Sequence, residues 1–302
     1  ANTDTFAKGL GLFGTRTRKS RRSFFGSYER KSPEDKATEA AKMRRAIYRK
    51  NPSRIDIEEE LFVGRHLIAS YLDLLGGELL PTKEYSAAWD YCNVLCRTIG
   101  KKMWSRRDRK WRVAIVESRA AEIFSAPPHF IIITTGLLKK INSEGQLAAL
   151  LAFEMALISK KIHLHACFRT SNRQSKKIGL GDLLSAAAES RGQSGSSYKS
   201  SFPEIDHCEH NVLKGLFGRD NYLKADECTV SVLAHIGYSP VSHEINLHTL
   251  KDLRRMSLRK AAPKEVLRLK KLKAYIKKNL QWACGFPQDR KRYRRELLQV
   301  LP

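Results

Sequence analysis

The sequence predicts an α+β fold that is mainly helical, with a small β-sheet in its middle and a basic extension at each end. Two segments with apolar residues at helical spacing come first, two short runs rich in β-branched residues follow, and further helical segments complete the pattern. With 302 residues the chain can bury a core without disulfides or a structural metal.

The first helices are predicted from apolar spacing and from the residues that end them. Over 56–75 apolar side chains recur on one helical face, and two glycines stop the segment. Over 85–99 a second helix is expected, again followed by a glycine. A helix is also expected earlier, over 34–50, ended by a proline.

Two short strands are predicted next, at 111–116 and 130–135. Both are rich in Val, Ile or Thr, and Pro127-Pro128 marks a turn before the second strand. We expect the two strands to form a hairpin. We also expect 130–135 to be an edge strand, which could pair with an extended peptide.

The second half of the chain is predicted to be helical around one insertion. Ser143 followed by Gln146 resembles a capping box, which opens a helix that we expect to run to about residue 165. Residues 170–203 are rich in Ser, Gly and Lys and are interpreted as a loop or insert. A helix is expected over 221–236, and the chain from about 243 onward reads as basic and helical.

The formal net charge of +25 is concentrated at the two ends. Residues 1–54 carry 15 Lys and Arg against 5 Asp and Glu, residues 251–302 carry 17 against 4, and the body, 55–250, carries 24 against 22. We therefore expect a basic N-terminal extension, a nearly neutral body and a basic helical C-terminal region. Such an excess is typical of a protein that binds a polyanion, whether nucleic acid, an anionic membrane or an acidic protein. The side chains expected to bind it are Arg16, Arg18, Lys19, Arg21, Arg22, Arg254, Arg255, Lys270, Lys271, Lys273, Lys277 and Lys278.

The six cysteines are too few for a disulfide scaffold in a chain of this length. Cys92 and Cys96 share one face of the helix predicted over 85–99, so we expect them to be free thiols in the core. No apolar run has the length of a membrane-spanning helix.

Four stretches of the body share their order and spacing with a known family. They are 124–138 (FSAPPHFIIITTGLL), 146–157 (QLAALLAFEMAL), 222–240, which contains Lys-Ala-Asp and ends in Gly-Tyr-Ser-Pro, and 285–302 (GFPQDRKRYRRELLQVLP). Together they resemble the HExxH zinc metallopeptidases of the HtpX, BepA and CAAX-prenyl-protease type, which include the mitochondrial Oma type. The resemblance implies a gluzincin-like metallopeptidase domain whose closing segment, 285–302, packs on the body.

The resemblance also implies where zinc ligands would stand, and this sequence lacks them. The two histidines of the family's helix correspond to Phe153 and Leu157, and the third ligand, a glutamate, corresponds to Lys224. Apolar side chains cannot ligate zinc, and an ammonium group would repel it. Of the catalytic apparatus only the general base, Glu154, and a supporting carboxylate, Asp226, are retained. A general base without metal-bound water has no activated nucleophile at neutral pH.

Two arrangements of this former metal site remain open. In one, Lys224 pairs with Glu154 and replaces the charge of the metal. In the other, Lys224 extends to solvent and backbone donors cap Glu154. In both, we expect Phe153, Leu157 and Phe286, which replaces the histidine of the family's closing segment, to fill the vacated volume together.

Other candidate ligands are weaker. His163 and His165 are two residues apart and do not share a helix face, so they are interpreted as ordinary helix-end residues. His207, Cys208 and His210 form a tighter cluster that could bind zinc, but a second ligand pair at suitable spacing is missing.

We therefore expect a catalytically inactive, metallopeptidase-like protein that needs no cofactor and takes no small-molecule substrate. It would be a structural or scaffold subunit of a larger assembly, with protein subunits and a polyanion (the backbone of ribosomal RNA or an anionic lipid surface) as partners. An organellar ribosome or a membrane-associated complex in the mitochondrion, in the matrix or at the inner membrane, is the expected setting. A bacterial cell envelope is the alternative.

Two other functions are compatible with the sequence. The protein could be a regulator that holds a peptide in the old cleft, or an active hydrolase that uses Glu154. Arg292 corresponds to the arginine of the family's closing segment, and we expect it to keep a structural role.

Overall fold

The structure is a computed structural model that describes residues 55, 57–103, 110–166, 211–213, 217–253 and 265–302. The predicted helix over 34–50, the insert at 170–203 and the cluster of His207, Cys208 and His210 lie outside the described residues. So do the basic residues of the N-terminal extension, together with Arg254 and Arg255.

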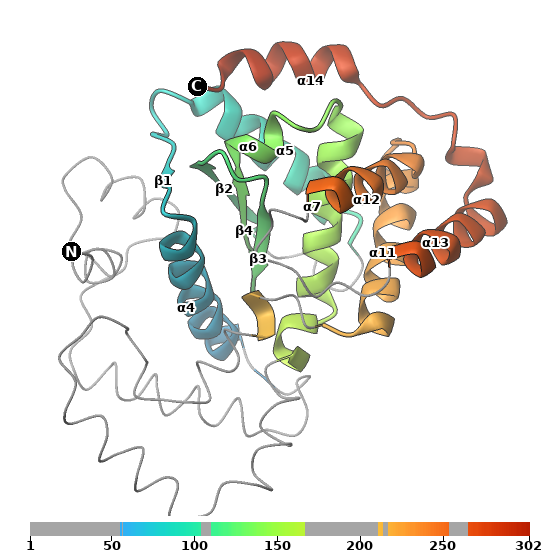
Figure 1. Cartoon of the computed structure of the whole chain (residues 1–302), viewed down its shortest axis with the longest axis horizontal. Coiled ribbons are helices and arrows are strands. Elements are labelled where there is room, and N and C mark those ends of the chain that lie inside the picture. Colours follow the sequence, from blue (N-terminus) through green and yellow to red (C-terminus); the bar gives the residue numbers. More distant parts are fainter. Residues whose placement is uncertain (1–54, 56, 104–109, 167–210, 214–216, 254–264) are drawn as a thin grey trace, which may run out of the picture.

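The described part of the fold is mainly helical, with one small mixed sheet (Figure 1). The sheet order is β1-β2-β4-β3. β4 pairs with β2 in parallel, with Val113 opposite Ile131, and pairs with β3 in an antiparallel manner. The strands are β1 (Glu78–Leu79), β2 (Arg112–Glu117), β3 (Ile123–Ala126) and β4 (Phe130–Thr134).

The predicted hairpin is wrong. The two predicted strands exist, as β2 and β4, but they run parallel because β3 returns the chain between them. Sequence reasoning missed β3 because its four residues, Ile123–Ala126, make too short a run for an alternation to be seen. The expectation that β4 is an edge strand is wrong for the same reason, since β4 has a neighbour on each side.

Helices cover both faces of the sheet. α4 (Ile57–Leu75) packs on β3 and β4, and α7 (Glu144–Ser159) packs on the same two strands from the other side, where α5 (Ser86–Gly100) also packs on β2 (Figure 1). All five residues of β4 are therefore buried, as expected for a strand covered on both faces. The helices predicted over 56–75 and 85–99 are confirmed.

Beyond α7 the chain adds a second helical layer. α11 (Arg219–His235) lies along α7, α12 (Val241–Leu253) packs on both, and α13 (Glu265–Asn279) packs on α11 and α12. α14 (Arg290–Glu296) crosses over α5 and α7 (Figure 1). The short elements are α6 (Thr135–Leu138) and two 3₁₀ turns, η4 (Gln281–Ala283) and η5 (Leu298–Val300).

α7 is the central helix. It begins as predicted: Ser143 Oγ accepts a hydrogen bond from the Gln146 amide at 3.2 Å, and Gln146 Oε1 accepts one from the Asn142 amide at 2.8 Å. It ends at Ser159 and not near residue 165, because Lys161 adopts a left-handed conformation with φ +53°.

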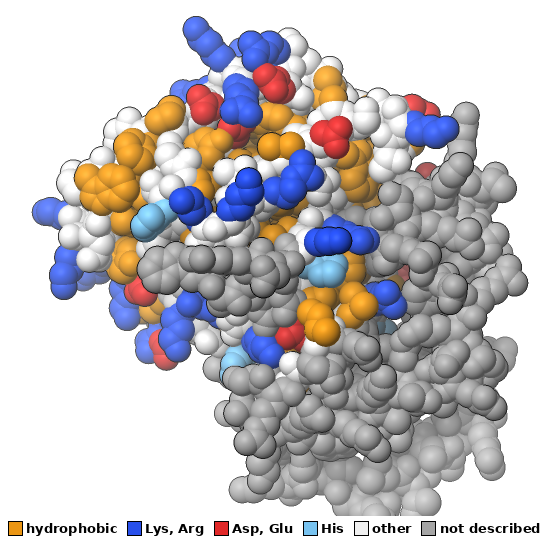
Figure 2. Space-filling model, turned by 180° about the vertical axis from the view of Figure 1, so that it is seen from behind, with side chains coloured by type: hydrophobic (Ala, Val, Ile, Leu, Met, Phe, Trp, Pro, Cys, Tyr) orange, Lys and Arg blue, Asp and Glu red, His pale blue; other side chains and the backbone are white. Residues whose placement is uncertain are grey.

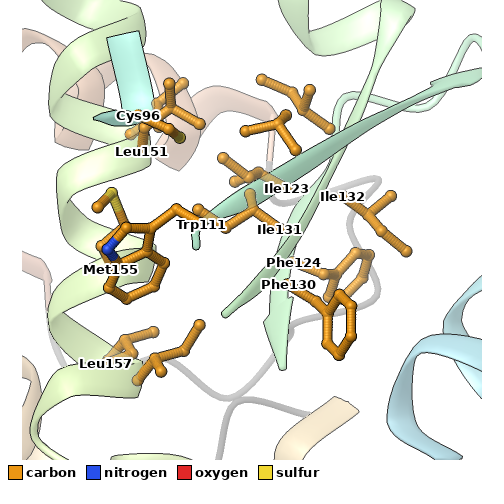
Figure 3. Packing of buried hydrophobic residues seen from close by; sticks show 14 of the residues in the cluster. Cys96, Trp111, Ile123, Phe124, Phe130, Ile131, Ile132, Leu151, Met155 and Leu157 are labelled. Atoms are coloured by element: carbon orange, nitrogen blue, oxygen red, sulfur yellow. The ribbon is translucent and has the colours of Figure 1, made fainter. Parts of the chain in front are cut away.

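The core lies between this helix and the sheet. Leu151, Met155 and Leu157 project from α7 into the region of Trp111 and Ile131 (Figure 3). Cys92 and Cys96 are completely buried free thiols, as predicted. Among the described residues, no helix combines the length and apolar character that crossing a membrane requires.

Candidate functional site

The pairing of α7 with α11 brings together the positions that the sequence singled out. Phe153 on α7 stacks on Tyr222 of α11, with ring centroids 6.2 Å apart and an interplanar angle of 14°. Leu157, one turn further along α7, is completely buried. Asp226, one turn after Tyr222 on α11, is 1% exposed.

A guanidinium group from a third helix lies at the centre of this site. Arg268 of α13 donates from Nε to Asp226 Oδ2 at 2.9 Å and from Nη2 to Asp226 Oδ1 at 2.6 Å. Arg268 is only 1% exposed. The two side chains therefore form a buried bidentate ion pair, the geometry in which arginine binds a carboxylate most strongly.

Aromatic rings enclose the cation of Arg268. Its Cζ lies 4.7 Å from the ring centroid of Tyr222 and 5.3 Å from that of Phe153, both within the range of a cation–π interaction. His243 of α12 completes the group: its Nε2 lies 2.9 Å from Asp226 Oδ1, and its ring lies 5.5 Å from that of Phe153. We call Phe153, Tyr222, Asp226, His243 and Arg268 the arginine cluster.

The electrostatics of the arginine cluster keep Asp226 ionised. Burial by itself raises the pKa of the Asp226 carboxyl. The positive charge of Arg268 and hydrogen bonds from His243 and Arg268 act in the opposite direction and outweigh burial, so the pKa of Asp226 is lowered. A negative carboxylate and a positive guanidinium therefore neutralise each other inside the protein.

Glu154 belongs to a different contact network, on the sheet side of α7. Its Oε2 accepts a hydrogen bond from Ser125 Oγ of β3 at 2.5 Å. The same hydroxyl oxygen lies 3.1 Å from His163 Nε2. Glu154, Ser125 and His163 are each at most 1% exposed, so this carboxylate sits in the interior rather than at an open surface.

The structure separates the other predicted members of the former metal site. Lys224 is exposed, which agrees with the second of the two arrangements left open by the sequence, and the hydroxyl of Ser125 donates to Glu154. The prediction that Phe286 would join Phe153 and Leu157 is wrong. Phe286 packs with a second core cluster that includes Leu272 and Ile276, because its segment follows α13 rather than α7.

The residues at these positions do not fit a zinc ion. Of the three ligand positions that the resemblance implies, two are apolar and the third is an exposed lysine, and a guanidinium already neutralises the carboxylate of Asp226. In the part of the chain that the structure describes, no three His, Cys, Asp or Glu side chains gather closely enough to hold a metal ion. His163 is buried, whereas His165 is exposed.

Sequence reasoning missed Arg268 and His243. A signal for Arg268 was present: it precedes Leu272 and Ile276 at intervals of four residues, which places a lone arginine on the apolar face of a lysine-rich helix. His243 carried no such signal, because the direction of its side chain depends on how the first turn of α12 packs and not on a sequence pattern.

A hollow with a volume of about 550 Å³ lies where α14 crosses α5 and α7. At its wall the carboxylate of Glu144, which is 2% exposed, accepts hydrogen bonds from the hydroxyls of Tyr91 and Tyr238. Arg292 Nε lies 3.3 Å from Glu144 Oε2. Burial and the hydrogen bond to Glu144 raise the pKa of both tyrosines. Arg292 therefore links the closing segment to the start of α7.

The described members of the predicted polyanion-binding set line α13. Lys270, Lys271, Lys273, Lys277 and Lys278 are all exposed. Lys273 forms a surface ion pair with Glu244 of α12 at 2.9 Å.

The family model described as Peptidase family M48 matches residues 95–276, which is more than half of the chain. The chain belongs to this family. The matched region contains α7, α11 and the arginine cluster, so the residues of the candidate site lie within the M48 domain. No curated protein matches the chain.

Proposed function

We propose that this protein is a catalytically inactive M48 member that serves as a structural, scaffold subunit of a larger assembly. In this proposal its gluzincin-like domain has lost the metal, and its basic ends, 1–54 and 251–302, attach it to a polyanionic partner. The arginine cluster is the observation that carries the loss of catalysis.

The argument rests on charge and space. A zinc ion carries two positive charges and needs anionic or neutral donors around it. At this site the cation is Arg268, and its partner is the Asp226 carboxylate at 2.6 and 2.9 Å. The rings of Phe153 and Tyr222 lie against the same guanidinium, so aromatic side chains supply part of its surroundings. A metal placed beside this group would meet a like charge in a poorly solvated interior.

The position of Glu154 supports the same conclusion. A general base must reach the water or substrate that it deprotonates. Glu154 is 1% exposed and its Oε2 is engaged by the Ser125 hydroxyl. This contact gives the carboxylate a structural role between α7 and β3.

The test is metal content together with proteolysis, on the full chain. Purified protein is expected to contain far less than one zinc per chain by elemental analysis and to leave an unfolded protein substrate intact, with or without added zinc. A preparation with about one zinc per chain, and with cleavage abolished by Glu154→Gln, would contradict the proposal.

The scaffold role needs a separate measurement. The tagged full chain, expressed in its own cells, is expected to sediment with a large particle, as an organellar ribosome or a membrane-associated mitochondrial complex would. Removing residues 1–54 is expected to release it at physiological salt, because an electrostatic anchor weakens when its charges are lost. Sedimentation as a free monomer in both forms would refute the scaffold role.

A regulator that holds a peptide in the old cleft is the alternative. Such a peptide would have to pair with β3, which is the end strand of the sheet next to Glu154. A bacterial cell envelope is the alternative setting for either function.

A further inference from the structure

A basic hollow of about 430 Å³ lies along the outer side of α14. Lys and Arg side chains gather over this helix at the upper edge of the molecule (Figure 2). The lining is wholly polar and contains no acidic residue: Asn142, Arg290, Lys291, Arg294, Arg295 and Gln299. We call this the α14 hollow.

The fold fixes the direction of these four cations. Tyr293 and Leu297, four residues apart, are completely buried, and the Tyr293 hydroxyl donates to the Leu138 carbonyl oxygen at 2.6 Å. One side of α14 is thereby held on the body. Arg290, Lys291, Arg294 and Arg295 are all exposed on the rest of the helix.

The charges of the α14 hollow are poorly balanced from within. Arg290 and Arg294, and likewise Lys291 and Arg295, are spaced four residues apart, so like charges lie one above the other and repel. Glu296 offsets part of this, since its Oε1 accepts a hydrogen bond from Arg295 Nη2 at 2.6 Å. The ion pairs of α14 within the described residues are those of Arg292 and Arg295, and none joins Arg290, Lys291 or Arg294 to an acidic side chain, so an external anion would relieve the repulsion.

The ligand that suits this surface carries several phosphates in a row. Cations four residues apart on a helix are separated by roughly 6 Å along its axis, which favours a chain of regularly spaced charges over a single ion. Arginine forks bind phosphate oxygens, and the carboxamides of Asn142 and Gln299 add donors for phosphate or sugar oxygens. A membrane-binding surface would need apolar side chains among the cations, and this lining has none.

We propose that the α14 hollow binds the phosphodiester backbone of a nucleic acid, through charge and shape and without reading sequence. The proposal rests on the proposed function for the idea of a polyanionic partner, and it adds a site that the predicted binding residues did not include. Nucleic-acid affinity should then depend on α14 more than on the lysines of α13.

The experiment measures binding of the full chain to a labelled 20-nucleotide single-stranded RNA of mixed sequence over a range of salt concentrations. One variant carries Arg290→Gln, Lys291→Gln, Arg294→Gln and Arg295→Gln. The matched control carries Lys83→Gln, Lys101→Gln, Lys102→Gln and Lys160→Gln, which removes the same charge from exposed lysines of the body, outside the predicted binding set. Three or four lost phosphate contacts should reduce the slope of log affinity against log salt by about 2–3 and weaken binding more than tenfold at physiological salt. The control should change the slope by less than one.

Further arms decide between explanations. Arg290→Lys, Arg294→Lys and Arg295→Lys together keep the charge and should keep most of the slope. Unchanged melting temperatures show that the variants fold. Equal losses in the α14 variant and the control would overturn the proposal, as would absence of RNA binding by the unmodified chain. Binding to vesicles with anionic lipid, but not to RNA, would overturn it in favour of a membrane.

Zinc content, measured on the same preparations, keeps the two proposals apart. A zinc-loaded, proteolytic protein with α14-dependent RNA binding would contradict the proposed function and support the α14 hollow. A metal-free, inactive protein whose RNA binding does not depend on α14 would support the proposed function and contradict the α14 hollow as the binding site.

Discussion

Arg268 and Asp226 form a buried ion pair that joins α13 to α11. Both side chains are 1% exposed, and the guanidinium meets both carboxylate oxygens. This ion pair lies beside the positions at which the resemblance to zinc metallopeptidases implies metal ligands. The contacts of this pair give the first prediction.

Arg268→Gln is expected to lower the free energy of unfolding by about 3–5 kcal/mol, because it leaves the Asp226 carboxylate buried without its cation. Urea denaturation measures the change. The matched control is Lys273→Gln, which breaks the exposed ion pair with Glu244 and should cost less than about 1 kcal/mol. Equal, small losses for the two variants would mean that the buried pair contributes little.

The second prediction concerns the retained glutamate. Glu154→Leu should cost about 1–3 kcal/mol of stability, because the buried Ser125 hydroxyl loses its acceptor. Glu154→Gln keeps an acceptor oxygen and should cost less. Denaturation of both variants beside Ser125→Ala checks the contact, since the Ser125→Ala and Glu154→Leu effects should overlap rather than add. Fully additive losses would contradict the structural role of this hydrogen bond.

The third prediction is a pH dependence that comes from His129. Burial, with added repulsion from Arg112 and Arg65, lowers the pKa of His129 to about 4. The unfolded chain, with a pKa of about 6.5, binds more protons than the folded chain between these values. The free energy of unfolding should therefore rise from pH 4 to pH 6.5. His129 should contribute about 1–3 kcal/mol to this rise, and its partial exposure keeps the contribution small.

His129→Gln removes this contribution. The difference in stability between the unmodified chain and the variant should change across pH 4–6.5 and stay constant above pH 7.5. Denaturation midpoints at five or six pH values measure it. Parallel curves over the whole range would show that His129 keeps an ordinary pKa. Asp226 affects stability at lower pH, since its pKa is lowered and its stabilisation is lost only below about pH 4.

The fourth prediction tests the close approach of α4 to the turn before β4. A Cβ atom at Gly64 would lie 1.4 Å from the carbonyl oxygen of Pro127, so either the helix or the turn must move. Gly64→Ala is expected to destabilise the protein by more than about 2 kcal/mol. Gly285→Ala is the control, because nothing lies within 4 Å of the added methyl group. If both variants melt at the same temperature, α4 does not pack as described.

The sequence predicted the helical elements better than the pairing of the strands. The capping box at Ser143, the glycine stops after α4 and α5, and the buried thiols of Cys92 and Cys96 all follow from local spacing. The sheet order depends on β3, whose four residues carry no periodic signal, so the parallel pairing of β2 and β4 could not be predicted.

The candidate site divides in the same way. That Phe153, Leu157 and Lys224 are not zinc-ligand residue types can be read from the sequence, because it concerns the kinds of side chain alone. A cation from Lys224 was one of the two arrangements that the sequence left open, whereas the structure brings Arg268 to Asp226 from a helix 42 residues further along the chain. Only the tertiary packing of α13 on α11 determines that contact.

The burial of α7 on every side has a consequence for synthesis of the protein. Its neighbours β3, β4 and α5 precede it in the chain, whereas α11, α12 and α14 follow it. A nascent chain that has left the ribosome only as far as Ser159 has no partners for the second side of this apolar helix. The packing of this domain around α7 is therefore completed only after α14 has been translated, and until then one side of an apolar helix lacks its partners.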